Sequence, residues 1–316
     1  MTDVASVAAP AGGSLKRRKL PGNRRWQRCR ERVIEGVLFV CALSAVAITA
    51  AIIGVLLYES STFFERVSLW TFLTDTQWTP LFENPRYGIL PLVSGTVTTS
   101  AVALLVAIPL GTITAIYLSE FARPRVREVV KPILELISGV PTVVFGYFAL
   151  LFVTPMLQKL IPGLPGFNLL GPGIVIGIMI VPYISSLSED AMRAVPMHLR
   201  EASYGMGASR FQTAVRVVVP AATSGIVASY ILAISRAVGE TMVVAIAAGQ
   251  QPNLTFDPTE SAATITAFIV QVAMGDLPHG SIGYQSIFAA GLTLLMMTLV
   301  FNLLGHWARK RFREAY

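Results

Sequence analysis

The chain has few of the residues on which most enzyme active sites depend. Its 316 residues include three histidines and two cysteines. His198, His279 and His306 lie on separate segments and match no HExxH or GxSxG pattern, while Cys29 and Cys41 fit no metal-ligand spacing. A nucleotide-binding GxxxxGK(S/T) loop is also missing. We therefore expect a protein that is not an enzyme, has no metal or cofactor, and depends on a partner for any ATP-driven work.

Charged residues are also scarce, and long hydrophobic runs take their place. Only 14% of the chain is charged, against about 25% in a typical soluble domain, and 53% is hydrophobic. About 20 helical residues are needed to cross the roughly 30 Å hydrocarbon layer of a bilayer. We therefore predict an all-α polytopic membrane protein with six spanning helices. The runs long enough to span are 33–58, 93–118, 132–157, 171–187, 217–249 and 285–306.

Two segments fit a simple span poorly. The run 217–249 would measure about 50 Å as a straight helix, which is more than one crossing needs. We expect its first turns to lie at the membrane interface. The segment 261–274 is too short for a span and contains polar residues, so we expect an interfacial helix there.

The basic residues predict the orientation, because cytoplasmic loops retain Lys and Arg. With the N-terminus inside, 21 of the 25 basic residues lie on the cytoplasmic side and three outside, and only Arg236 falls within a span. Both termini are therefore predicted to be cytoplasmic, and the basic tail is expected to contact anionic lipid rather than nucleic acid. The predicted segments outside the spans are a tail over 1–32, an external loop over 59–90, a cytoplasmic loop over 188–216 and a tail over 307–316.

The cytoplasmic loop has an internal pattern. Gly207 follows Glu201 by six residues, and Pro220 follows that glycine by thirteen. This spacing predicts a short helix lying across the membrane surface, then a turn, then a proline that restarts the next helix. Such a helix would suit docking, although a solvated amphipathic connector would have the same composition.

This pattern resembles the EAA loop of bacterial ABC importer permeases, in which the loop supplies the coupling helix that sits in a groove of the ATPase subunit. Ser203 stands where the family usually has alanine, and Val219 where it has leucine. Both changes keep a small or apolar side chain. The resemblance implies contact with the ATPase for Arg200, Glu201, Ala202 and Gly207.

Four shorter blocks narrow the resemblance to the PstC-type permeases of phosphate importers. They are FLTDTQWTP at 72–80, RYGILPLVSGT at 86–96, SGVPTVVFG at 138–146 and SRAVGETM at 235–242. The resemblance implies the type I importer (MetI-like) fold over 91–306 and a place in the bacterial inner membrane. It also implies a PstA-like second permease, two PstB-like ATPase subunits and an external PstS-like phosphate-binding protein as partners.

Two charges, Arg236 and Glu240, lie within the apolar run 217–249, where a charge is costly. Four residues apart on one helix, they would share a face and could pair. A guanidinium donates two parallel hydrogen bonds to phosphate oxygens, so we hypothesise a relay in which phosphate and Glu240 compete for Arg236. Ser235 and Thr241 complete the expected substrate pathway. The alternative is that Arg236 reaches the headgroups from the end of the helix, with Glu240 as its surface partner.

Two other functions remain open. One is an ABC importer permease for another oxyanion, such as sulfate, molybdate or phosphonate. The other is a stand-alone secondary transporter in which Arg236 and Glu240 form an ion relay. Such transporters commonly contain internal repeats, and the sequence has no second block similar to SRAVGET.

Overall fold

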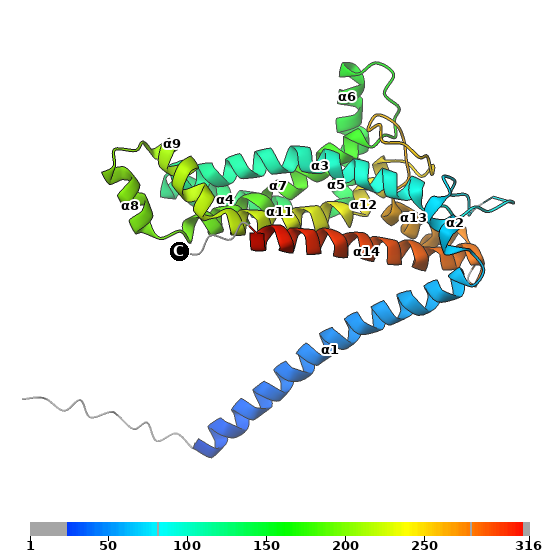
Figure 1. Ribbon diagram of the computed structural model, residues 1–316, viewed down its shortest axis with the longest axis horizontal. Coiled ribbons are helices and arrows are strands. Elements are labelled where there is room, and N and C mark those ends of the chain that lie inside the picture. Colours follow the sequence, from blue (N-terminus) through cyan, green and yellow to red (C-terminus); the bar gives the residue numbers. More distant parts are fainter. Residues whose placement is uncertain (1–23, 81, 279, 312–316) are drawn as a thin grey trace, which may run out of the picture. The chain divides into compact units, whose positions relative to one another are not determined.

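The computed structural model describes residues 24–80, 82–278 and 280–311, and in these residues all the regular structure is helical (Figure 1). The chain divides into two compact units, residues 1–54 and 55–316. In the first unit the described residues all belong to helix α1, which runs from Arg24 to Phe64 and ends in the second unit. Val37, Phe39 and Val46 are among its many exposed apolar residues. A helix that is apolar on all sides is typical of a membrane span.

The second unit contains the remaining helices. These are α2 (Leu69–Thr74), α3 (Leu90–Ile116), α4 (Pro124–Ser138), α5 (Thr142–Phe148), α6 (Thr154–Leu160), α7 (Leu170–Arg193), α8 (Met197–Gly205), α9 (Arg210–Thr213), α10 (Val219–Ala221), α11 (Thr223–Val238), α12 (Met242–Ala247), α13 (Ile265–Gln271) and α14 (Ile282–Arg311). Four π-helical turns join some of them: η1 (Tyr117–Phe121), η2 (Ala149–Val153), η3 (Ala214–Val218) and η4 (Val272–Asp276). Helices α3, α7, α11 and α14 run side by side, with α8 and α9 at one end of this bundle and α2 and α13 at the other (Figure 1).

Five helical segments among the described residues are long and apolar enough to cross a membrane. They are Arg30–Phe64, Leu90–Phe121, Thr142–Leu160, Leu170–Arg193 and Ile282–Lys310. The pair Arg210–Ala221 and Thr223–Val238, bent by 71°, makes a sixth if it counts as one span. The predicted all-α polytopic fold is therefore confirmed, and the six predicted spans are found if the bent pair counts as one. The cytoplasmic placement of both termini stays a prediction.

Two of the predicted helices are interrupted in the structure. The run 132–157 is divided at residues 139–141 between α4 and α5, where Pro141 lacks the amide hydrogen that a continuous helix needs. The run 217–249 bends near Ala222 and stops at Gly239, before α12 begins. Mean hydropathy could not locate these breaks, because the average over a long run hides a few polar or helix-breaking residues. The predicted loop 188–216 is correspondingly shorter, since α7 continues to Arg193 and both α8 and α9 lie inside it.

Most of the segment 261–274 is packed inside the second unit, although Met274 near its end is exposed. Ile265 and Phe268 of α13 are buried, and Thr96 of α3 accepts a hydrogen bond from the Ile265 amide at 3.0 Å. The side chain of Thr264 caps the start of the helix. The helix is therefore present and packed against α3, with side-chain hydroxyls satisfying part of its polar backbone, and its position at the membrane interface stays a prediction.

Close contact between α3 and α7 depends on residues without a side chain. A β-carbon added to Gly173 would lie 2.7 Å from the Val102 side chain, and one added to Gly177 would lie 2.7 Å from the Ala103 carbonyl oxygen. Glycines at this spacing let two membrane helices approach closely. The two helices form the centre of the second unit.

A buried carboxylate attaches α4 to α7. Glu189 of α7 is fully buried and forms ion pairs with Arg127 and, at 3.1 Å, with Lys131 of α4. Lys131 also lies 2.8 Å from Asp190. Burial alone would lower the pKa of Lys131, but its hydrogen bonds to Asp190 and Glu189 and their negative charges raise it above the ordinary lysine value. The network therefore holds the amphipathic helix α4 against the bundle.

Replacing Glu189 by glutamine is expected to destabilise the protein by roughly 2–4 kcal/mol, because two partly buried cations would lose their shared anion. For the detergent-purified Glu189→Gln variant, the apparent unfolding temperature should be several degrees below that of the natural protein. The neighbouring Asp190→Asn is the control, since that side chain is 57% exposed and its pair with Lys131 should contribute less than about 1 kcal/mol. Equal unfolding temperatures for the two variants would contradict this view of the network.

Candidate functional site

Arg236 lies in the last turn of α11 and faces α7. Its guanidinium carbon is 4.9 Å from the centre of the Tyr183 ring. The side chain is half-buried, its Nε atom is buried without a hydrogen-bond partner, and no ion pair among the described residues includes it. A ring face stabilises the cation but uses none of its five N–H donors. Arg236 is therefore a positive charge beside the Tyr183 ring, with no ion-pair partner among the described residues and with its terminal N–H donors unused there.

Glu240 is close to Arg236 in sequence but is not on the same helix. Helix α11 ends at Val238, Gly239 follows it as the C-cap, and Glu240 lies in the link to α12. In the described residues no ion pair joins the two side chains, so the pair predicted for a continuous helix is not formed in this structure. Glu240 is buried, and its carbonyl oxygen accepts a 2.7 Å hydrogen bond from Thr266. That bond fixes the link against α13.

The two neighbouring polar residues point to other partners. Ser235 donates a 2.9 Å hydrogen bond to Asn302 of α14, and Thr241 donates one of 3.2 Å to the Gly239 carbonyl. The predicted pathway residues are therefore adjacent along the chain but do not converge on one point. Tyr183 and Asn302 were not predicted, because contacts between distant helices leave no spacing signal in the sequence.

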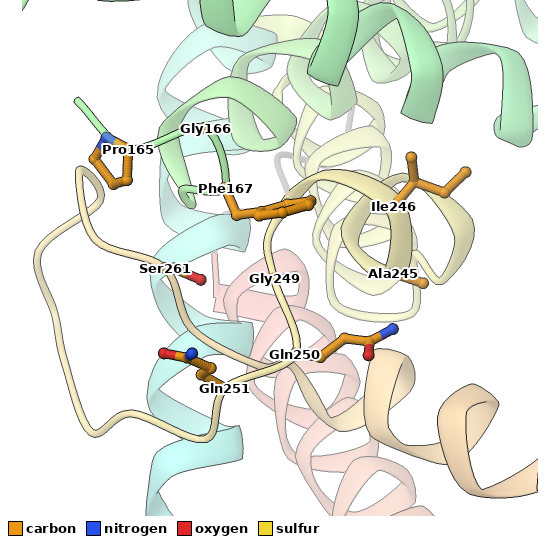
Figure 2. A pocket seen from close by; sticks show the side chains of 9 residues that line it. All are labelled: Pro165, Gly166, Phe167, Ala245, Ile246, Gly249, Gln250, Gln251 and Ser261. Carbon is orange, nitrogen blue, oxygen red and sulfur yellow. The ribbon is translucent and has the colours of Figure 1, made fainter. Parts of the chain in front are cut away.

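A hollow lies at the far end of α12 from Glu240 (Figure 2). Its volume is about 570 Å³. The residues that line it come from the segment before α7, the end of α12 and the loop after it: Pro165, Gly166, Phe167, Ala245, Ile246, Gly249, Gln250, Gln251 and Ser261. Its polar side chains are two amides and one hydroxyl, which can both donate and accept hydrogen bonds. Because none of these residues is charged, the charge pattern of the sequence gave no sign of the hollow.

Gly249 makes the turn that shapes this hollow. Its φ of +100° is in the left-handed region, and an added β-carbon would collide with the Ser261 hydroxyl. Ser261 in turn donates a 3.2 Å hydrogen bond to the Ala248 carbonyl. Only glycine allows the loop after α12 to return this closely to the helix end.

The predicted short helix in the cytoplasmic loop is present as α8. Glu201 and Ala202 are exposed on it, Gly207 with a φ of +84° makes the turn that follows, and Ser209 caps α9 with Gln212 in a capping box. Pro220 lies in the first turn of α10, as the pattern predicts. Large apolar side chains are exposed around these residues: Met197, Tyr204, Met206 and Phe211. In the described residues nothing covers them, so α8 and α9 present an apolar surface of the kind that docks onto another protein.

Arg200 differs from its neighbours on α8 because it points inward. Its guanidinium donates to Glu120 of η1 at 3.0 Å and to the carbonyl oxygens of Met192 and Val195 at 2.8 and 2.6 Å. The last carbonyls of a helix have no partner within the helix, so Arg200 caps the end of α7 while it holds η1. It attaches α8 to the bundle instead of extending its exposed face.

Comparison with known proteins gives consistent matches. The family model described as "binding-protein-dependent transport system inner membrane component" matches residues 107–314. The probable ABC transporter permease protein YqgH of Bacillus subtilis (strain 168) is 35% identical over 92% of this chain and 93% of its own. The phosphate transport system permease protein PstC of Mesorhizobium japonicum is 34% identical over 73% of this chain and 75% of its own.

Solved structures of low sequence identity show the same fold. In the crystal structure of a bacterial ABC transporter that imports alginate, one chain is similar with a TM-score of 0.64, at 17% identity over 92% of this chain and 100% of that one. A chain of the inward-facing methionine transporter MetNI matches with a TM-score of 0.53, at 16% identity over 72% of this chain and 95% of that one. The predicted type I importer permease fold is therefore confirmed, and the apolar helices identify a multi-pass protein of the inner membrane. The chain belongs to the family of binding-protein-dependent transport system inner-membrane components, the permease subunits of ABC importers.

Proposed function

We propose that this chain is a permease subunit of an ATP-driven phosphate importer and forms half of its transmembrane pathway. The observation that carries the proposal is the Arg236 guanidinium, which is held over the Tyr183 ring with no anion bound to it among the described residues. A planar guanidinium matches two phosphate oxygens and stays charged at any physiological pH. Relatives named PstC, at 30–34% identity, support phosphate over other oxyanions.

In the proposed relay, phosphate reaches Arg236 and Glu240 then assists its release. Glu240 follows Gly239 in a link rather than in a helix, so its side chain can approach the guanidinium if α11 and α12 move relative to each other. A carboxylate close to Arg236 weakens the hold on the anion, and conduction requires weak or multiple sites. The neutral hollow beyond α12 serves as the outer approach, where amides replace part of the hydration of phosphate without trapping it.

The partners follow from the same proposal. A PstA-like permease would supply the other half of the pathway, two PstB-like subunits would hydrolyse ATP, and a PstS-like protein would deliver phosphate from outside. The chain itself is the non-catalytic membrane subunit. We assign the exposed face of α8, with Glu201, Ala202 and the turn at Gly207, to the groove of the ATPase. The reason is that the large apolar side chains on this face are exposed in the described chain.

Uptake of labelled phosphate into vesicles that contain the assembled complex tests this function. We expect uptake to require both ATP and the binding protein. Excess unlabelled phosphate should suppress it, whereas sulfate, molybdate or phosphonate at the same concentration should not. Suppression by one of those oxyanions would assign the pathway to that substrate instead. Uptake that persists without the ATPase would identify an autonomous carrier and contradict the importer.

A further inference from the structure

A second hollow lies between the start of α11 and the end of α14, apart from Arg236 and from the coupling helix. Its volume is about 580 Å³, and it is lined by Ser224, Gly225, Ala228, His306, Arg309 and Lys310. Half of these residues are basic or imidazole side chains, and none is acidic. The end of α14 that contributes them lies at the same end of the bundle as α8 (Figure 1).

The charges in this hollow are available to a ligand. Arg309 and Lys310 are exposed and take part in no ion pair within residues 24–80, 82–278 and 280–311. One Arg309 nitrogen lies 3.1 Å from Nδ1 of His306. A guanidinium can only donate, so Nδ1 of His306 accepts in this contact. The hollow is therefore lined by a guanidinium, an ammonium and the Ser224 hydroxyl, which can all donate hydrogen bonds to an anion.

The neighbours of the hollow on α14 indicate which kind of anion it binds. Trp307, next to it on α14, is 66% exposed, and tryptophan is enriched at the level of lipid headgroups. Leu299, Val300 and Leu303 are exposed on the preceding turns, where a spanning helix faces acyl chains. Because the hollow is at one end of the candidate span Ile282–Lys310, an anion bound there would be near the headgroups. A basic pocket between membrane helices at that level is suited to a phospholipid headgroup.

We propose that this hollow binds the phosphate group of an anionic phospholipid, with Arg309 and Lys310 as its main ligands and the acyl chains along the apolar face of α14. Inorganic phosphate has the same charge and oxygen geometry and is the other possible source of the anion. The lipid is favoured because Trp307 and the exposed leucines beside the hollow match the rest of a lipid molecule, whereas they offer nothing to a free ion.

The assembled complex in detergent is titrated with phosphatidylglycerol or phosphatidylcholine, and bound lipids are counted by native mass spectrometry. Arg309→Gln with Lys310→Gln should weaken phosphatidylglycerol binding roughly 10- to 30-fold, since each basic residue near anionic lipid contributes about a factor of five. The matched control is Arg123→Gln with Arg125→Gln, which removes the same charge from exposed residues near the start of α4 and should change binding less than about threefold.

Three outcomes would overturn the proposal. Equal weakening by both double variants would indicate diffuse attraction rather than a site. Equal binding of phosphatidylglycerol and phosphatidylcholine by the natural complex would show that headgroup charge is irrelevant. Displacement of phosphatidylglycerol by millimolar inorganic phosphate, but not by the same ionic strength of chloride, would assign the hollow to the free ion.

Discussion

Replacing Arg236 by glutamine is expected to reduce ATP-dependent phosphate uptake by about 100-fold or more. Glutamine keeps much of the length and polarity of the side chain but removes the charge and the pair of parallel N–H donors of the guanidinium. Hydrogen bonds to a charged partner contribute about 1.5–3 kcal/mol each, so losing two of them exceeds the roughly 2.7 kcal/mol that corresponds to 100-fold. Because Arg236 forms no ion pair with another described residue, the substitution leaves no buried anion unpaired, and assembly should be unaffected.

Two measurements make this result specific. The ATPase rate of the complex and its composition after purification should match those of the natural complex. Arg236→Lys is the informative companion, since lysine retains the charge without the planar fork and should give intermediate uptake. Normal uptake by Arg236→Gln would eliminate the relay and favour the alternative in which this arginine only anchors α11 near the headgroups.

Replacing Glu201 by lysine is expected to reduce uptake at least about tenfold by a different route. Glu201 is exposed on α8 and its side chain forms no ion pair with another described residue, so the variant should fold normally. The reversed charge would lie in the proposed contact with the ATPase, where it would repel any basic group that pairs with the glutamate, and like charges at an interface cost several kcal/mol. Both the stimulated ATPase rate and the recovery of the ATPase with the permease should therefore fall, which distinguishes this variant from Arg236→Gln.

The control for Glu201→Lys is Glu128→Lys on α4, another exposed glutamate that makes no ion pair among the described residues. It makes the same change in net charge away from α8 and should leave uptake within about twofold of normal. Full ATPase activity and normal assembly with Glu201→Lys would show that the ATPase docks elsewhere on the chain.

The sequence predicted features that depend on local composition or on fixed spacing. Scarce charge indicated the membrane, and the interval from Glu201 to Gly207 to Pro220 predicted α8, its turn and the restart at α10. Mean hydropathy did not locate the breaks at residues 139–141 and at Gly239, because an average over a long run hides a few polar or helix-breaking residues. The environment of Arg236 also had to come from the structure, since Tyr183 approaches it only when α7 packs on α11.

The hydrogen bonds of Arg200 have a mechanical consequence. They join α8 to the end of α7 and to η1 through one side chain whose guanidinium is held by three acceptors, and only residues 194–196 separate the two helices. A force applied to the exposed face of α8 therefore reaches two membrane helices together and in phase. If a partner displaces α8, the stiffness of these Arg200 hydrogen bonds determines how much of that movement is passed on to α7 and η1.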